Sequence, residues 1–353
     1  MTSPITVFGH KIATRIGAKP ADFVFSPLSL WTALTLTVSG SNGDTLKEAA
    51  DALAFEADIP RTGHRQLGDV LNFACSRLQR YRKDILIANA VAIGDGMILM
   101  PQFLKIVHES FDGEIFCGTS PTTINRWVSQ KTQGRITKIL DGDPADVVVL
   151  NAALFKSKWR TPFDKFNTTI SRFYGPRAQD CHMMNICDKF AYSNNGTQAI
   201  RLPYNTNAPL SALIILPQKG NPLILPPIAS LLSQMTTSEV DLYLPRFEKT
   251  FSVSFSGDAL SMPLAFSDLA DFSRMGSKNS KPLKIERVLH KAFLKVDEEG
   301  TEATAATAVV LNSYSAGPSK PPPVVMRVDR PFIFAIIDHS VGDLLFVSHV
   351  FSI

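Results

Sequence analysis

The side chains that could act as nucleophiles, general acids or bases, or metal ligands are scattered along this chain. The seven histidines include no HExxH pair, and neither a GxSxG nor a GxxxxGK[ST] motif occurs. Gly94-Asp95-Gly96 lacks the third glycine of a dinucleotide-binding loop. An EF-hand loop starting at Asp141 needs glutamate where Ala152 stands. We therefore expect neither enzymatic activity nor a bound metal or cofactor.

Charge and cysteine content narrow the class of partner further. The 353 residues carry 36 basic and 32 acidic side chains, a net charge of +4, which is low for a dedicated nucleic-acid binder. No apolar stretch reaches the length of a membrane span. Cys75, Cys117, Cys181 and Cys187 form no CxxC pair, so we expect four buried thiols rather than disulfides or a zinc site.

One short basic run is a candidate binding surface. Arg77, Arg80, Arg82 and Lys83 could bind a sulfated polysaccharide. A charged helix face of this size is more often simply solvated, so we keep the polysaccharide only as a weak alternative.

The most informative segment reads DEEGTEATAATAVV, from Asp297 to Val310, and about twenty polar and proline-containing residues follow it. Such a long connection is usually functional or disordered. Its first part alternates, with small and then apolar residues on one side of an extended chain: Thr301, Ala303, Ala305, Thr307, Val309 and Leu311. An Ala-rich surface helix fits the same residues. A segment that can be loop, helix or strand is what a conformational switch requires.

The rest of the fold must hold this segment in place. The sequence predicts mainly helices in the first half of the chain and mainly strands in the second half. Ser26-Pro27 and Ser120-Pro121 are typical helix starts, and residues 45–48 have the form of a capping box. Apolar and polar residues alternate over 240–244 and 251–255, which predicts half-buried strands. The apolar runs 332–337 and 344–350 predict strands that are covered on both faces.

Taken in order, these and other motifs resemble the serpin family over nearly the whole chain. The match starts with FVFSPLS at Phe23 and continues through INRWV at Ile124 and NAALFKSKW at Asn151. LPY at Leu202, LPRF at Leu244, HKA at His290 and RPF at Arg330 follow in the family's order. The resemblance implies an α+β fold with three β-sheets and eight or nine helices. It also implies one domain, residues 1–353, with an exposed reactive-centre loop at about 298–325.

By this resemblance, the chain is a monomeric suicide inhibitor of serine proteases that binds neither nucleic acid nor a membrane. The target protease cleaves the loop and is trapped as an acyl-enzyme while the loop inserts into the central sheet. The family's count from Gly300 gives Tyr314 as the specificity residue, with Ser315 just past the cut. An aromatic residue there suits the hydrophobic pocket of chymotrypsin-like enzymes such as chymotrypsin, cathepsin G and chymase.

Further site residues follow from the same resemblance. The hinge comprises Glu298, Gly300, Thr301, Glu302, Ala303, Thr304, Ala305, Ala306 and Thr307. The small hinge residues, without proline, suit rapid insertion as a strand. Gate and shutter positions beneath and beside the opening sheet are Ser26, Ser29, Asn151, Trp159, Arg246 and His290. Among these positions, Arg246 is expected to pair with Glu298.

Two other functions remain open. A non-inhibitory serpin, acting as a carrier, chaperone-like or storage protein, would be cleaved as an ordinary substrate. A cross-class inhibitor would trap papain-like cysteine proteases. Without a signal peptide in the sequence as given, we expect a cytoplasmic or leaderless secreted protein, or an extracellular one if a leader has been removed.

Overall fold

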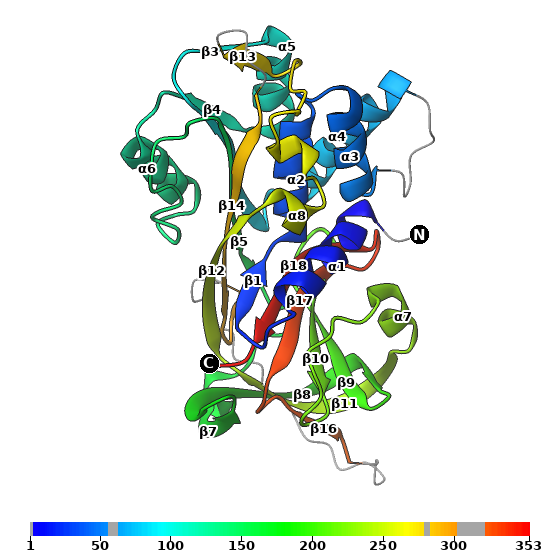
Figure 1. Cartoon of the computed structure of the whole chain (residues 1–353). Coiled ribbons are helices and arrows are strands. Elements are labelled where there is room, and N and C mark those ends of the chain that lie inside the picture. The colour runs from blue at the N-terminus through cyan, green and yellow to red at the C-terminus, as the bar shows by residue number, and fades with distance from the viewer. Residues whose placement is uncertain (1–2, 56–62, 279–282, 302–321) are drawn as a thin grey trace.

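The computed structural model describes residues 3–55, 63–278, 283–301 and 322–353 (Figure 1). Within these ranges, eight α-helices and three β-sheets make a mixed α+β fold, which confirms the expected fold class. The helices are α1 (Pro4–Ile16), α2 (Pro27–Val38), α3 (Gly43–Ala52), α4 (Gly63–Tyr81), α5 (Pro101–Lys105), α6 (Pro121–Lys131), α7 (Ile228–Ser233) and α8 (Gly257–Leu260). Short π or 3-10 turns follow at η2 (Ile106–Ser110), η3 (Lys165–Asn167) and η4 (Leu264–Phe266).

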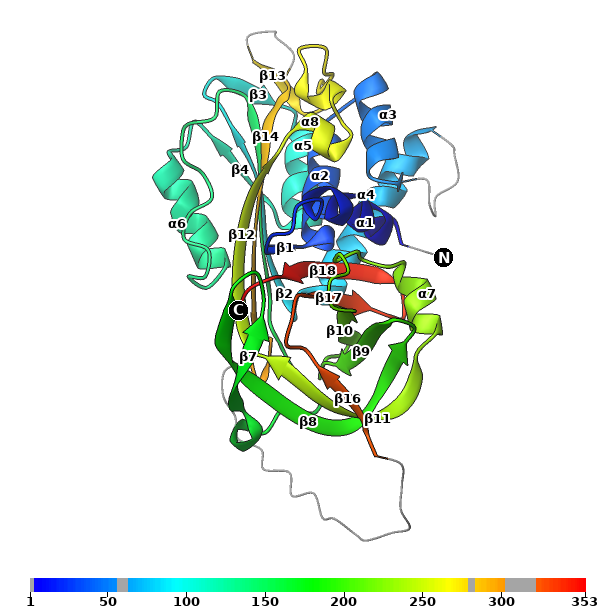
Figure 2. The same ribbon diagram turned by 60° about the horizontal axis from the view of Figure 1, so that its bottom comes forward.

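The seven-stranded sheet runs along one side of the molecule (Figure 2). It contains β4 (Glu114–Cys117), β2 (Ile85–Ile93), β5 (Val147–Phe155), β14 (Ile285–Val296), β15 (Gly300–Thr301) and β6 (Ser157–Lys158), with β12 (Phe247–Phe255) paired to β14. Helix α6 covers one face and α2 the other, so β5 is buried along its whole length. We call this sheet the central sheet.

The nine-stranded sheet occupies the other half of the molecule. Its order is β1 (Phe23–Phe25), β18 (Asp343–Val350), β17 (Phe332–Asp338), β10 (Leu210–Pro217), β9 (Thr197–Pro203), β8 (Ala178–Asn194), β11 (Thr236–Pro245) and β16 (Val324–Arg327), and β7 (Thr169–Tyr174) pairs with β8. A third sheet pairs β13 (Gly276–Lys278) with β3 (Met97–Leu99). The predicted strands at 240–244, 251–255, 332–337 and 344–350 are confirmed.

Helix α2 is buried and packs against β5 of the central sheet and β18 of the nine-stranded sheet. Ser26 caps it, because its hydroxyl accepts a hydrogen bond from the amide of Ser29 at 3.2 Å, and Pro27 is the first helical residue. All twelve residues of the helix are buried. Its threonines satisfy their hydroxyls within the helix, as in Thr35 donating to the Trp31 carbonyl at 2.8 Å. The sequence signals for this helix and for α6, which Ser120 caps, are confirmed.

Two local expectations are wrong. Helix α3 begins at Gly43 rather than at residues 45–48, and the predicted capping residues bind a distant segment instead. The hydroxyl of Thr45 accepts from the amide of Asp271, and the carboxylate of Glu48 accepts from the amide of Leu264, both at 2.9 Å. The thiols also differ from expectation, since only Cys181 of the four is buried. All four are free.

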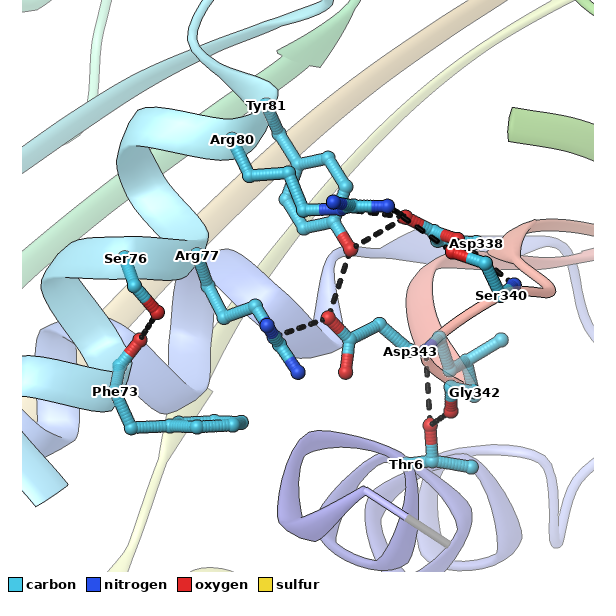
Figure 3. A network of polar contacts seen from close by, with 11 residues as sticks. Thr6, Phe73, Ser76, Arg77, Arg80, Tyr81, Asp338, Ser340, Gly342 and Asp343 are labelled. Carbon is cyan, nitrogen blue, oxygen red and sulfur yellow. Dashed lines mark hydrogen bonds and ion pairs between the residues drawn. The ribbon is translucent and has the colours of Figure 1, made fainter. Parts of the chain in front are cut away.

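Two of the four residues of the basic run at the end of α4 form ion pairs (Figure 3). Arg77 pairs with Asp343 and Arg80 with Asp338, each at 2.7 Å, and both carboxylates have no exposed side-chain surface. The hydroxyl of Tyr81 lies between the same two carboxylates, 2.8 Å from Asp343 and 3.1 Å from Asp338. Half of the candidate polysaccharide surface therefore links α4 to the turn between β17 and β18.

The described residues offer neither a membrane-spanning helix nor a metal site. None of their helices is long and apolar enough to cross a bilayer. They also contain no group of three or more His, Cys, Asp or Glu side chains positioned to hold a metal ion.

Candidate functional site

The central sheet is closed along most of its length and open at one end. Strands β5 and β14 pair in parallel from Val147 opposite Ile285 to Leu154 opposite Phe293. Beyond that point β15 lies between β14 and β6, the short strand that follows β5 in the chain. Thr301 pairs with Val296 of β14 on one side and with Ser157 of β6 on the other. The chain therefore already contributes the first residues of an additional strand at this opening.

Gly300 and Thr301 fit this opening closely. Thr301 is fully buried, and its hydroxyl hydrogen-bonds the hydroxyl of Tyr204 at 2.7 Å. A Cβ on Gly300 would lie 2.7 Å from the Cα of Lys158 and would overlap the Ser157 carbonyl oxygen. Glycine is needed here because the backbones of β15 and β6 approach so closely.

An ion pair holds the turn that leads into β15. The guanidinium of Arg246 donates to Glu298 from Nε at 2.6 Å, and the hydroxyl of Thr168 donates to the same carboxylate at 2.5 Å. Glu298 itself is 2% exposed. Burial opposes its ionisation, but the hydrogen bonds from Arg246 and Thr168 outweigh that effect and hold the pKa of the carboxyl below its usual value.

Trp159 contributes the wall of the opening. Its indole donates to the carbonyl of Asp297 at 2.9 Å, and its ring stacks on Tyr204 with centroids 4.5 Å apart. The backbone amide of Trp159 also donates to the Glu299 carbonyl at 2.9 Å. These contacts fix residues 297–299 against the start of the opening.

A buried polar cluster crosses the central sheet below the opening. His290 of β14 lies opposite Asn151 of β5, and their side chains are hydrogen-bonded through Nδ1 and Oδ1. Nε2 of His290 accepts from the amide of Ser26 at 3.2 Å, and the amide of Asn151 donates to the hydroxyl of Ser29 at 2.6 Å. The cluster therefore joins both strands to the start of α2.

The histidine of this cluster is held neutral. Burial lowers the pKa of His290 from its ordinary value near 6.5 to about 3. Because Nε2 accepts a hydrogen bond, the ring proton resides on Nδ1 and is donated to Asn151. Separating β5 from β14 would break this bond.

The structure brings together the hinge residues Glu298, Gly300 and Thr301 and the positions Trp159 and Arg246 at the opening. It places Ser26, Ser29, Asn151 and His290 in the cluster beneath it. The remaining hinge residues, 302–307, and the bond between Tyr314 and Ser315 lie outside the described residues.

Sequence reasoning missed Asn89, Tyr204 and Thr168. Asn89 lies opposite Asn151 in the sheet and accepts from its side-chain amide. A signal for it was present, because Asn89 interrupts the apolar run of β2 as Asn151 interrupts that of β5. The contacts of Tyr204 and Thr168 had no comparable signal, since their partners lie 97 and 130 residues away.

The neutral, buried His290 predicts a loss of stability in acid. The unfolded chain binds a proton below about pH 6.5, whereas folded His290 does so only near its pKa of about 3, so stability falls as the pH drops through this window. By pH 5 the loss from this group is about 2 kcal/mol. Burial also lowers the pKa of His349, to about 4, so this residue adds to the loss of stability in acid.

The variant His290→Gln removes the titrating group, so its urea midpoint should fall less than that of the parent between pH 7 and pH 5. The control is His108→Gln, which changes an exposed histidine and should behave as the parent does. Equal falls in midpoint for all three proteins would contradict this account.

The Arg246 ion pair predicts a second effect. Glu298→Gln keeps the size of the side chain but leaves Arg246 without its charge partner, so we expect the free energy of unfolding to fall by about 1 to 3 kcal/mol. Glu109→Gln is the matched control, because Glu109 pairs with Lys105 at 3.8 Å on an exposed surface. Urea unfolding at pH 7 measures both, and a Glu298→Gln midpoint no lower than that of Glu109→Gln would exclude a stabilising role for the pair.

Comparison with known proteins gives one consistent result. The sequence model of the serpin (serine protease inhibitor) family matches residues 4–353. Intracellular coagulation inhibitor 2 of Tachypleus tridentatus is 28% identical over 99% of this chain and 90% of its own length. Alpha-1-antichymotrypsin of Pongo abelii is 31% identical over 94% of this chain and 83% of its own length.

Solved structures agree with the sequence match. The thermophilic serpin tengpin in its native state superimposes with a TM-score of 0.87 and is 28% identical, over 99% of this chain and 93% of that one. The family match, the similar structure and the partly filled opening between β5 and β14 lead to the same assignment. The chain is a member of the serpin family of serine protease inhibitors.

Proposed function

We propose that this serpin inhibits chymotrypsin-like serine proteases as a suicide substrate. The observation that carries the proposal is the position of Thr301, which is fully buried between β14 and β6 where the central sheet opens. The residues that follow it are small on the side that would face the core. A cleaved loop could thus continue the strand that Thr301 starts.

The chemistry begins at the loop. The protease's catalytic serine attacks the carbonyl carbon of Tyr314, the bond to Ser315 breaks, and the new amino terminus at Ser315 takes up the proton. Tyr314 remains attached to the protease as an ester. An aromatic residue at this position suits a hydrophobic primary pocket, and the name of the similar antichymotrypsin points to the same target class.

Insertion then traps the ester. Strand β15 is antiparallel to both of its neighbours, so its extension replaces the parallel pairing of β5 with β14 by two antiparallel pairings. Antiparallel pairs are slightly more stable per residue, and the inserted strand gains hydrogen bonds on both edges. At about 3.3 Å per residue, insertion to Tyr314 carries the protease on the order of 45 Å from the hinge.

A polysaccharide partner at Arg77, Arg80, Arg82 and Lys83 is not part of this proposal. Arg77 and Arg80 are committed to buried carboxylates, which leaves only Arg82 and Lys83 of the run outside those ion pairs. Two exposed cations are a weak binding surface for a sulfated chain.

Mixing with chymotrypsin tests the trapping step, and Thr301→Arg tests its mechanism. The parent should form an adduct that survives denaturation and should release the fragment Ser315–Ile353. Thr301→Arg should be cleaved with little adduct. Thr301 is fully buried at the start of the inserting strand, so an arginine there would place an unpaired charge in the sheet at a cost of several kcal/mol, and ester hydrolysis would become faster than insertion. Quantitative cleavage of the parent without adduct would instead make the chain a non-inhibitory serpin.

The matched control is Glu302→Arg. By alternation from Thr301, residue 302 points to the opposite, exposed side of an inserting strand. The Glu302→Arg variant should therefore form as much adduct as the parent, although it carries an added arginine only one position further along the chain. Equal yields from Thr301→Arg and Glu302→Arg would mean that burial of this side of the hinge does not trap the protease.

Tyr314→Arg tests specificity. It should abolish adduct formation with chymotrypsin and create it with trypsin, whose primary pocket carries a carboxylate that pairs with guanidinium. The discrimination should be at least a hundredfold in rate, because either mismatch leaves a charged group unpaired, at about several kcal/mol. Gel assays measure adduct formation with each protease, and sequencing of the released fragment gives the cleavage position. An unchanged preference for chymotrypsin over trypsin, together with a fragment that starts elsewhere than Ser315, would place the reactive bond at another residue.

A further inference from the structure

A recess of about 530 Å³ opens between strands β8, β9 and β11, the turn after β9 and the turn between β17 and β18. This volume lies in the usual range of small-molecule sites. Its wall carries four basic side chains, Arg160, Lys189, Arg201 and His339. No residue that lines it, all of them described, is an aspartate or a glutamate.

The cations of this basic recess lack counter-charges within the described residues. Arg160, Lys189 and Arg201 make no ion pair there, in contrast to Arg77 and Arg80 on α4. Within the described part of the chain, two carboxylates lie nearby without forming an ion pair with these cations. Asp338, next to His339, is bound by Arg80, and Glu239, opposite Lys189 in the sheet register, is exposed and forms no ion pair in the described structure.

Two buried donors in the recess are also unsatisfied. Nε of Arg201 and the hydroxyl of Ser211 are buried and have no hydrogen-bond partner among the described residues. Ser211 is fully buried. Leaving such groups unpaired costs free energy, so each one calls for a partner. An acceptor bound in the recess is a candidate partner for these donors.

The strands hold these donors in fixed positions. Arg201 of β9 lies between Ala191 of β8 and Leu213 of β10, and Ser211 lies opposite Pro203, two residues further along β9. Because side chains two residues apart share one face of a sheet, Arg201 and Ser211 are on the same face. The amide of Arg160 donates to the Pro203 carbonyl at 2.9 Å, which attaches the second arginine to the end of β9.

Electrostatics agrees with this geometry. Burial, and then the neighbouring charge of Arg160, lowers the pKa of the Arg201 guanidinium below its ordinary value. A guanidinium with a carboxylate partner shows the opposite direction, as Arg80 does beside Asp338. Among the described residues, no carboxylate is therefore paired with Arg201.

We propose that the basic recess binds the phosphate group of a small molecule through Arg160, Lys189, Arg201 and Ser211. Several positive charges match a multiply charged phosphate better than a single carboxylate, and guanidinium groups bind phosphate through paired hydrogen bonds. Ala191 and Pro203, on the same face as Arg201, also line the recess and offer apolar surface to the organic part of such a ligand. The proposal does not depend on protease inhibition.

Isothermal titration of the full chain with inorganic pyrophosphate, at an ionic strength fixed with sodium chloride, tests the proposal. The parent should give saturable binding with one site. Arg201→Gln should weaken it by at least about tenfold, because one charge-assisted pair of hydrogen bonds is lost. Arg160→Gln, which alters an exposed side chain, should also weaken binding and covers the case in which Arg201→Gln does not fold.

Arg126→Gln is the matched control, since it removes the same charge from the exposed side of α6. It should bind pyrophosphate as the parent does. Titrations of the parent with inorganic phosphate and with phenyl phosphate compare ligands without and with an organic part, and phenyl phosphate should bind more tightly of the two. The absence of saturable binding to the parent, or equal affinities for Arg160→Gln and Arg126→Gln, would overturn the proposal.

Discussion

The parallel pairing of β5 with β14 is the constraint on which the rest of this structure depends. Both strands lie in the middle of a sheet covered by α2 on one face and α6 on the other, so their hydrogen bonds are shielded from water. They are joined from Val147 and Ile285 to Leu154 and Phe293 and separate only where Thr301 lies between them. Any further strand must enter at this point and must replace the pairing residue by residue.

The polar cluster beneath the opening gives this pairing a second, side-chain component. The bond between His290 and Asn151 crosses the same pair of strands, and both residues also bind the first turn of α2. Buried polar groups are costly when they lose their partners, so opening the sheet here carries a high transient cost even if the final state is more stable. The cluster therefore resists separation of β5 from β14.

The arginines of this chain have contrasting environments. Arg77, Arg80 and Arg246 are paired with carboxylates of which little or nothing is exposed, and they join segments far apart in sequence. Arg160 and Arg201 face a recess without carboxylates. A count of basic residues along the chain does not distinguish the two groups, because the distinction depends on what the fold brings opposite each guanidinium.

Local chemistry in the sequence determined much of the element pattern, whereas the fold class came from the resemblance to a known family. Ser26 with Pro27 and Ser120 with Pro121 start helices because capping and a fixed φ act within a few residues. Alternation and apolar runs placed β11, β12, β17 and β18, since period and burial are written along each strand. The order of short motifs gave the serpin family.

Tertiary structure alone decided which polar residues meet. Asn42 rather than Thr45 precedes α3, and the Thr45 hydroxyl accepts instead from the amide of Asp271. Arg77 is paired with Asp343 from the far end of the chain. The resemblance singled out Asn151 and His290, but the contacts of Asn89 and Tyr204 appeared only once the strands were packed. A hydrogen bond between residues far apart in sequence depends on register and packing of whole sheets, and no local pattern specifies these.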